Sequence, residues 1–168
     1  RLSDTPNGGQ RIYMVQRYID SGPRPNHYRV LTALGVPLYM AHRWALKAKD
    51  GDARAPGSSE WRLVSNDAEE IEVQADEEVL AFARKMAAAM PEIGVLGADI
   101  VREAGTGKLY AMEGNSFGQT WHFSSDAYQN DKHRTGELDY YGQFGALDLL
   151  AGELVRRVRT EARIDPKG

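Results

Sequence analysis

The sequence predicts an α+β fold, in which a mainly antiparallel sheet has its helices packed on one face. Two pairs of segments rich in branched and aromatic residues are each joined by a short turn, which is typical of β-hairpins. Two other segments have apolar residues at helical spacing. With 168 residues, the chain is long enough to form one domain with its own core.

The first half of the chain contains the first of these hairpins. Residues 11–19 predict a strand that closes in a turn over 20–23, because branched and aromatic residues give way to Asp, Ser, Gly and Pro. The hairpin follows, with strands over 28–33 and 38–47 and a turn over 34–37. These segments would form one side of the sheet.

A polar stretch separates this hairpin from the first predicted helix. Residues 49–59 predict a surface loop, and residues 61–72 predict irregular or short-stranded chain. The helix begins near Asp76, a good N-cap residue, and ends before Pro91. Its expected apolar face consists of Val79, Phe82, Ala83, Met86 and Met90.

A second hairpin and a long helix complete the chain. The hairpin joins residues 97–103 to residues 109–116 through a glycine-containing turn over 104–107. The helix is expected over about 141–162. Its apolar residues at helical spacing are Phe144, Leu147, Leu150, Leu154, Val155 and Val158.

Composition excludes several classes of protein. The 21 basic and 24 acidic residues give a net charge of -3, so no basic field attracts nucleic acid. The absence of cysteine excludes disulfides and thiolate metal sites, and no apolar run approaches the ~20 residues that cross a bilayer. We expect a cytoplasmic protein without nucleic-acid or membrane partners. Because the chain begins with Arg1 in place of Met, we expect a single domain that is a piece of a longer protein, with its core over 11–125.

The second hairpin gathers oxygen-donating side chains. A turn centred on residues 105–106 predicts that Asp99 lies opposite Met112, with Glu113 and Asn115 at the neighbouring positions. Carboxylates side by side among apolar residues are costly to bury, and a hard divalent cation such as Mg²⁺ relieves this cost. Asp99, Glu113 and Asn115 are therefore candidate metal ligands. The alternative is a strand end at which the acids cap a turn or face water.

The first hairpin brings two arginines together. Its turn predicts that Arg29 lies close to His42 and Arg43 across the ladder. Two neighbouring guanidinium groups repel each other unless an anion lies between them, and phosphate oxygens suit the arginine fork. Arg29 and Arg43 are thus candidate catalytic residues that bind a phosphate group. The alternative is that each faces solvent or pairs with a local carboxylate.

These motifs, in this order, resemble the C-terminal half of an ATP-grasp domain. The resemblance covers about residues 11–115 and is closest to carboxylate–amine ligases, such as glutathione synthetase and the enzymes that add glutamate to protein or peptide ends. The matching segments are the strand over 14–19, Tyr28-Arg29-Val30, Ala41-His42-Arg43, Gly97-Ala98-Asp99-Ile100 and Glu113-Gly114-Asn115.

The resemblance implies an enzyme that uses ATP and two Mg²⁺ ions, with Mn²⁺ as a substitute. Glu113 would bridge the two ions, and Asp99 and Asn115 would each hold one. ATP would phosphorylate a carboxylate, and an amine would displace phosphate to form an amide. The substrates would be a small-molecule or peptide carboxylate and an amine.

The resemblance also assigns residues to the nucleotide and the substrate. Adenine would bind the main chain of the strand that ends at Ile19, and Asp20 would contact the ribose because His27 stands where the family has an acid. The nucleotide-binding residues are Gln16, Arg17, Tyr18, Ile19 and Asp20. The candidate substrate contacts are Arg62, Asn66, Ser116 and His122, for which a solvated loop or a structural role is the alternative.

Two other functions remain open at this point. One is a nucleotide-binding module that kept the fold and lost the chemistry, and the other is a kinase-like phosphotransferase on the same scaffold. The glycine-rich lid and the lysines of a whole ATP-grasp enzyme have no counterpart in the sequence. We therefore expect the 168-residue chain alone to bind ATP weakly and to show no measurable catalysis.

Overall fold

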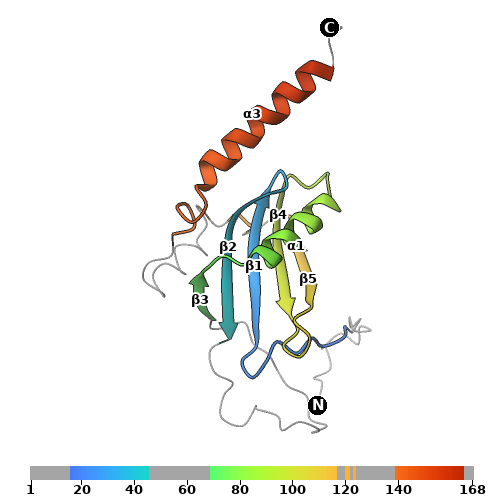
Figure 1. Cartoon of the computed structure of the whole chain (residues 1–168), viewed down its shortest axis with the longest axis vertical. Coiled ribbons are helices and arrows are strands. Elements are labelled where there is room, and N and C mark those ends of the chain that lie inside the picture. The colour runs from blue at the N-terminus through green and yellow to red at the C-terminus, as the bar shows by residue number, and fades with distance from the viewer. Residues whose placement is uncertain (1–15, 46–68, 117–119, 122, 124–138, 165–168) are drawn as a thin grey trace, which may run out of the picture.

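The computed structural model describes residues 16–45, 69–116, 120–121, 123 and 139–164. Five strands form one antiparallel sheet in the order β3-β2-β1-β4-β5, and two helices accompany it (Figure 1). The predicted α+β class with an antiparallel sheet is confirmed. The elements are β1 (Asn26–Ala33), β2 (Val36–Ala45), β3 (Glu69–Val73), α1 (Glu77–Ala88), β4 (Val95–Arg102), β5 (Leu109–Asn115) and α3 (Ala146–Ile164).

The β1–β2 hairpin closes through Leu34 and Gly35, whose φ angles of 52° and 84° suit a two-residue turn between twisted strands. A β-bulge after Leu31 shifts the register by one residue. Arg29 lies opposite Ala41, so its expected place near residues 42 and 43 is wrong by one position. The turn is the cause, because it consists of Leu34 and Gly35 alone and is shorter than the predicted turn over 34–37, and the bulge makes up one residue of the difference.

Helix α1 covers one face of the sheet, as predicted. Asp76 caps its first turn, since its Oδ1 accepts hydrogen bonds from the backbone N–H of Glu78 at 3.0 Å and of Val79 at 3.2 Å. Glu77 and Glu78 lie in this first turn, where negative charge is favourable. The buried residues on this face are Tyr28, Val30, Met40, Val79, Leu80, Ala83, Ala98 and Ile100.

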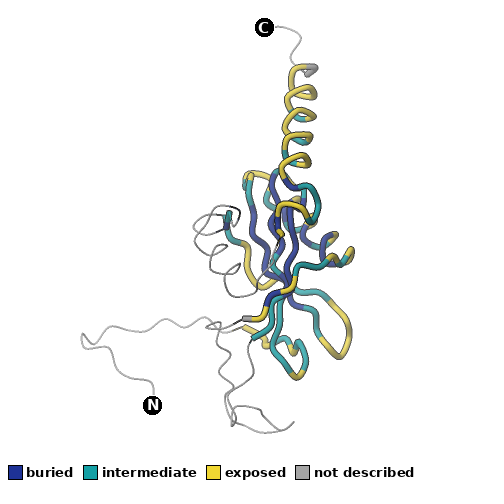
Figure 2. Tube along the Cα trace, turned by 90° about the vertical axis from the view of Figure 1, so that its left-hand side faces the viewer, coloured by how far each residue is buried: buried dark blue, intermediate teal, exposed yellow. Residues whose placement is uncertain are grey.

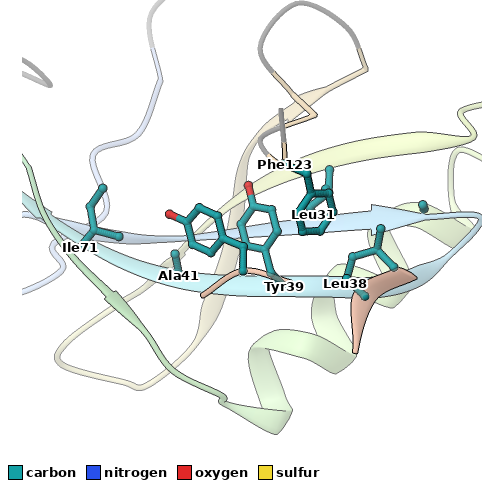
Figure 3. Packing of buried hydrophobic residues seen from close by; sticks show 9 residues of the cluster. Leu31, Leu38, Tyr39, Ala41, Ile71 and Phe123 are labelled. Carbon is teal, nitrogen blue, oxygen red and sulfur yellow. The ribbon is translucent and has the colours of Figure 1, made fainter. Parts of the chain in front are cut away.

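The opposite face of β1 and β2 is covered by residues from the second half of the chain. Tyr39 stacks on Tyr140 with ring centroids 4.2 Å apart, and Phe123 packs edge-on against Tyr39 (Figure 3). This packing covers the half of the face near Leu31 and Ile71. The remaining half, around Arg29, is where polar side chains gather.

Helix α3 begins five residues beyond the predicted start at 141, because Gly145 has a left-handed φ of 67° that ends the preceding turns. The helix contacts β2 and then leads away from the end of the sheet, and most of its length is exposed (Figures 1 and 2). The Nη2 of Arg157 anchors it by donating to the carbonyl of Leu34 at 2.6 Å. Neither described helix is long and apolar enough to span a bilayer.

The predicted strand over 11–19 is wrong for residues 16–19, the part that the structure describes. These residues form no strand, and the segment instead contacts the β4–β5 turn. The backbone N–H of Ala104 donates to the carbonyl of Asp20 at 2.8 Å, and Arg17 pairs with Glu103. The loop predicted over 49–59 lies outside the described residues, whereas the expected short strand is present as β3.

We expect Asp76→Ala to lower the free energy of unfolding by roughly 1–2 kcal/mol, because it removes the cap of α1. Asp76 also accepts a hydrogen bond from Arg102 at 2.7 Å, so the loss includes that ion pair. Asp76→Asn keeps a capping oxygen and should lose less. Urea unfolding measures both, with Glu77→Ala as the exposed control in the same turn. Equal losses for Ala and Asn would show that the cap contributes nothing.

Acid should destabilise the fold through His42. Its ring lies against Tyr28 and Trp44, Gln74 Nε2 lies 2.6 Å from Nδ1, and Asn26 Oδ1 lies 2.9 Å from Nε2. Amide hydrogens on Nδ1 and an amide oxygen at Nε2 suit a neutral imidazole. Burial lowers the pKa of His42 from 6.5 to about 4, chiefly by disfavouring the charged form.

The unfolded chain therefore binds more protons than the folded chain between these two pKa values, and stability falls as the pH drops from 6.5 to about 4. The expected loss is on the order of 1–3 kcal/mol. Urea unfolding as a function of pH measures it, and His42→Phe should flatten the slope in this window whatever its own stability. An unchanged slope in the variant would contradict the assignment.

Candidate nucleotide and metal site

Asp99, in the middle of β4, is paired with Arg29 of β1. The two residues lie opposite each other in the β1–β4 ladder, and their side chains are 10% and 17% exposed. Arg29 Nη2 donates to Asp99 Oδ2 at 2.8 Å, and Arg29 Nε lies 2.5 Å from Oδ1. Burial raises the pKa of Asp99, and the guanidinium of Arg29 counteracts that rise. The pair thus neutralises a carboxylate that the sheet removes from water.

Gly97 makes room for this pair. A Cβ atom at this position would lie 3.1 Å from Arg29 Nη1 and equally close to Cγ2 of Thr120. The absence of a side chain therefore lets the guanidinium lie against the backbone of β4. Sequence reasoning placed Gly97 in a motif but gave it no role, because the approach of Arg29 and Thr120 comes from tertiary structure.

A β-bulge in the β4–β5 ladder decides which side chains face Asp99. Near the turn the pairing follows the predicted register, but from Asp99 on it shifts by one residue, so that Asp99 lies opposite Glu113. The predicted partner, Met112, is the extra residue of the bulge. Because neighbouring residues of a strand face opposite sides, the shift turns Glu113 and Asn115 to the face of Asp99. The predicted Asp99–Met112 pairing is wrong, but Asp99, Glu113 and Asn115 share one face.

Asn115 contacts Asp99 directly, whereas Glu113 does not. Asn115 Nδ2 lies 3.3 Å from Asp99 Oδ2, whereas Glu113 is exposed and acts on Asp99 only through its charge, which raises the pKa of Asp99. Among the described residues, no three His, Cys, Asp or Glu side chains are close enough to hold a metal ion. The buried Oδ1 of Asp99 contacts Nε of Arg29 as an ion pair but forms no hydrogen bond with the described residues.

The side chains of Asp99, Glu113 and Asn115 nevertheless offer the kind of atoms that bind a hard cation. Two carboxylates and an amide supply only oxygen, which Mg²⁺ and Mn²⁺ prefer. A cation at this place would require Arg29 to release Asp99 and Glu113 to turn inward. Metal binding by Asp99, Glu113 and Asn115 stays a prediction.

His27 lies between Asp99 and the second arginine. It is opposite Arg43 in the β1–β2 ladder, and its Nε2 lies 3.9 Å from Asp99 Oδ1. Burial, with the charges of Arg43 and Arg29, lowers the pKa of His27 to about 4. The imidazole is therefore neutral at pH 7, and the arginines supply the positive charge here. Arg43 and Arg29 lie on the same face, two positions apart across the ladder.

A cavity of about 570 Å³ adjoins this cluster. His27 lines it and thus connects it to Asp99. Four of the five predicted nucleotide-binding residues also line it. The lining residues include Gln16, Arg17, Tyr18, Ile19, Val101, Tyr110 and Met112. Sequence reasoning missed Val101, Tyr110 and Met112, although strand alternation could have placed the first two on the face of Asp99.

The remaining predicted residues lie away from the cavity or outside the described residues. Asp20 is not among the cavity-lining residues, and its carboxylate accepts a hydrogen bond from the backbone N–H of Gly22 at 2.9 Å. Ser116 is half-buried and directly follows Asn115. Arg62, Asn66 and His122 lie outside the described residues.

Comparison with known proteins finds distant likenesses among solved structures only. No family model matches the chain, and no curated protein matches it. Among solved structures, the chain is similar to the ATP-grasp ligase PsnB complexed with a minimal precursor, at 16% identity and a TM-score of 0.39. The match covers 68% of this chain and 31% of that one. A likeness this distant shows neither a shared site nor a shared activity.

We expect Arg29→Ala to lower the free energy of unfolding by about 3 kcal/mol, because it leaves Asp99 as a buried charge without its partner. Asp99→Ala should cost a similar amount, and the double variant should cost clearly less than the two together. Urea unfolding of all four proteins measures this coupling. Glu70→Ala breaks an exposed pair with Arg24 and serves as the control, with an expected loss below about 1 kcal/mol. Simple additivity would contradict the pairing.

Proposed function

We propose that this chain is the C-terminal half of an ATP-grasp domain, from a ligase that uses ATP and Mg²⁺ to join a carboxylate to an amine through an acyl phosphate. The position of Asp99 supports the proposal most. On one side it contacts the amide of Asn115, and on the other it approaches His27, which lines the cavity. A metal-binding carboxylate beside a nucleotide-sized cavity is the arrangement that phosphoryl transfer from ATP needs.

The cavity supplies the nucleotide site in this proposal. Its volume of about 570 Å³ is within the range of small-molecule pockets, which is roughly 300–1,000 Å³. Apolar surface from Ile19, Val101 and Met112 suits the faces of an adenine ring. Residues 16–19 belong to no strand and line the cavity, and we assign the edge of the base to their main chain. Gln16 and Tyr18 are the residues that we assign to this pairing.

Asp99, Glu113 and Asn115 would hold two Mg²⁺ ions, or Mn²⁺ in their place. These cations would offset the negative charge of the outer phosphates during transfer. Arg29 now holds both oxygens of Asp99, so it must release the carboxylate when a cation is bound. The charge of Asp99 stays balanced in this exchange, and the guanidinium of Arg29 then becomes available to a phosphate.

Arg29 and Arg43 would bind the transferred phosphate and the acyl phosphate. Both lie on the same sheet face as Asp99, and guanidinium groups suit planar and tetrahedral oxyanions. No side chain needs to act as a nucleophile, because alignment and charge neutralisation supply the catalysis. We assign the acceptor substrate, a small-molecule or peptide carboxylate and amine, to Ser116 together with Arg62, Asn66 and His122. A cytoplasmic location accords with the absence of cysteine.

A nucleotide-binding module without ligase activity is the second candidate. The pairing of Asp99 with Arg29 favours it, because a permanent ion pair would keep the cation out. The neutral His27, at the position where the resemblance leads us to expect an acid for the ribose, favours it as well. Metal-dependent binding separates the two candidates, since the module should bind ATP equally with and without Mg²⁺.

We expect the 168-residue chain to bind a non-hydrolysable ATP analogue weakly, and only in the presence of Mg²⁺. Asp99→Asn and Glu113→Gln should each weaken Mg²⁺-dependent binding by roughly tenfold or more, because each removes a charged oxygen donor. Isothermal titration with and without Mg²⁺ measures both effects. Glu70→Gln is the control, an exposed acid on the opposite edge strand.

Two results would overturn the ligase proposal. One is binding that is identical with and without Mg²⁺, and the other is binding that Asp99→Asn leaves unchanged. In the full-length protein, an amide product identifies a ligase, whereas a stable phosphorylated product identifies a kinase-like phosphotransferase.

A further inference from the structure

Helix α3 exposes an apolar stripe that packs against no described residue of the sheet. Leu147, Leu154, Val155 and Val158 are 54%, 48%, 49% and 64% exposed. At about 100° per residue, these positions and Ala151 fall within a sector of about 100°. The stripe spans residues 147–158 of a helix that ends at Ile164, and Figure 2 shows the helix exposed along most of its length.

The side of α3 that contacts the sheet is a different one. Ala146 is buried, Leu150 packs against the cluster around Tyr39, and Arg157 reaches the carbonyl of Leu34. On the helical wheel these three residues form a sector next to the apolar stripe but separate from it. The apolar stripe and the sheet-contacting side are therefore two different sides of α3.

Two opposite charges border the stripe on one side. Asp148 and Arg159 fall within about 20° of each other on the wheel, although they are near opposite ends of the helix. Both are exposed, and neither forms an ion pair with another described residue. Arg156 and Arg157, by contrast, are both paired with Glu153 of the same helix. Asp148 and Arg159 are thus available to a charged partner outside the described residues.

The spacing of these residues makes α3 complementary to itself in the antiparallel direction. Leu147 and Val158 are eleven positions apart, and so are Asp148 and Arg159. When two copies of the helix run antiparallel, the side chain of Leu147 in each copy lies opposite that of Val158 in the other, within the apolar seam between the helices. The same side of both helices then faces across the seam, so Asp148 of each lies beside Arg159 of the other.

We propose that a second copy of this chain covers the stripe, through an antiparallel pair of α3 helices with a two-fold axis near their middle. The pairing buries the exposed Leu154, Val155 and Val158 side chains and forms two equivalent Asp148–Arg159 ion pairs. It leaves the cavity and Asp99 untouched and does not depend on the proposed function.

Charge reversal tests the geometry directly. Asp148→Arg or Arg159→Asp alone places like charges together at both ends of the pair, and should weaken self-association by roughly tenfold. An equimolar mixture of the two variants restores opposite charges at both ends, as does the double variant carrying both changes. Sedimentation equilibrium should therefore show mass above 18.7 kDa for the unchanged chain, the mixture and the double variant, but much less for either single variant.

Two further variants complete the test. Leu154→Glu should abolish association because it places charge in the stripe, whereas Leu149→Glu, on the far side of the helix, should leave it intact. Circular dichroism verifies that each variant is folded. A chain that stays monomeric at its highest soluble concentration would overturn the proposal. A mixture that associates no better than either single variant would overturn the antiparallel arrangement.

Discussion

The ion pair between Arg29 and Asp99 is the interaction on which the rest of the site depends. A carboxylate in an inner strand of a five-stranded sheet loses most of its water, and only a bonded positive charge makes that position tolerable. The pair links β1 to β4 side by side, and it requires the bare backbone of Gly97 beneath the guanidinium. It also contributes positive charge that keeps His27 neutral.

One face of the sheet carries mainly apolar packing, and the other face also carries the candidate site. Helix α1 and its apolar partners form a hydrophobic cluster on one face, where His42 is held by its two amide partners. On the other face, Tyr39 and Tyr140 cover only one half. The other half holds Arg29, Asp99 and the cavity, and the strands beneath them are held in place by the packing on the far side.

The sequence predicted the elements better than their registers. Asp76 as a cap and the glycine-rich turns are local signals, and they correctly located α1 and both hairpins. The bulges after Leu31 and at Met112 have no such signal, because any residue can be the extra one. The strand predicted over 11–19 failed in its described part for a related reason, since branched residues favour extended chain but do not supply a partner strand.

The bulge at Met112 also sets which length changes this hairpin can tolerate. Residues 105–106 of the turn are exposed and lie between the paired strands, so a length change there leaves the pairing of β4 with β5 intact. A deletion of one residue between Leu109 and Glu113 would be absorbed by loss of the bulge, with Glu113 still opposite Asp99. The complete strand paired without the bulge would instead place Met112 opposite Asp99, and Glu113 and Asn115 would then point toward α1.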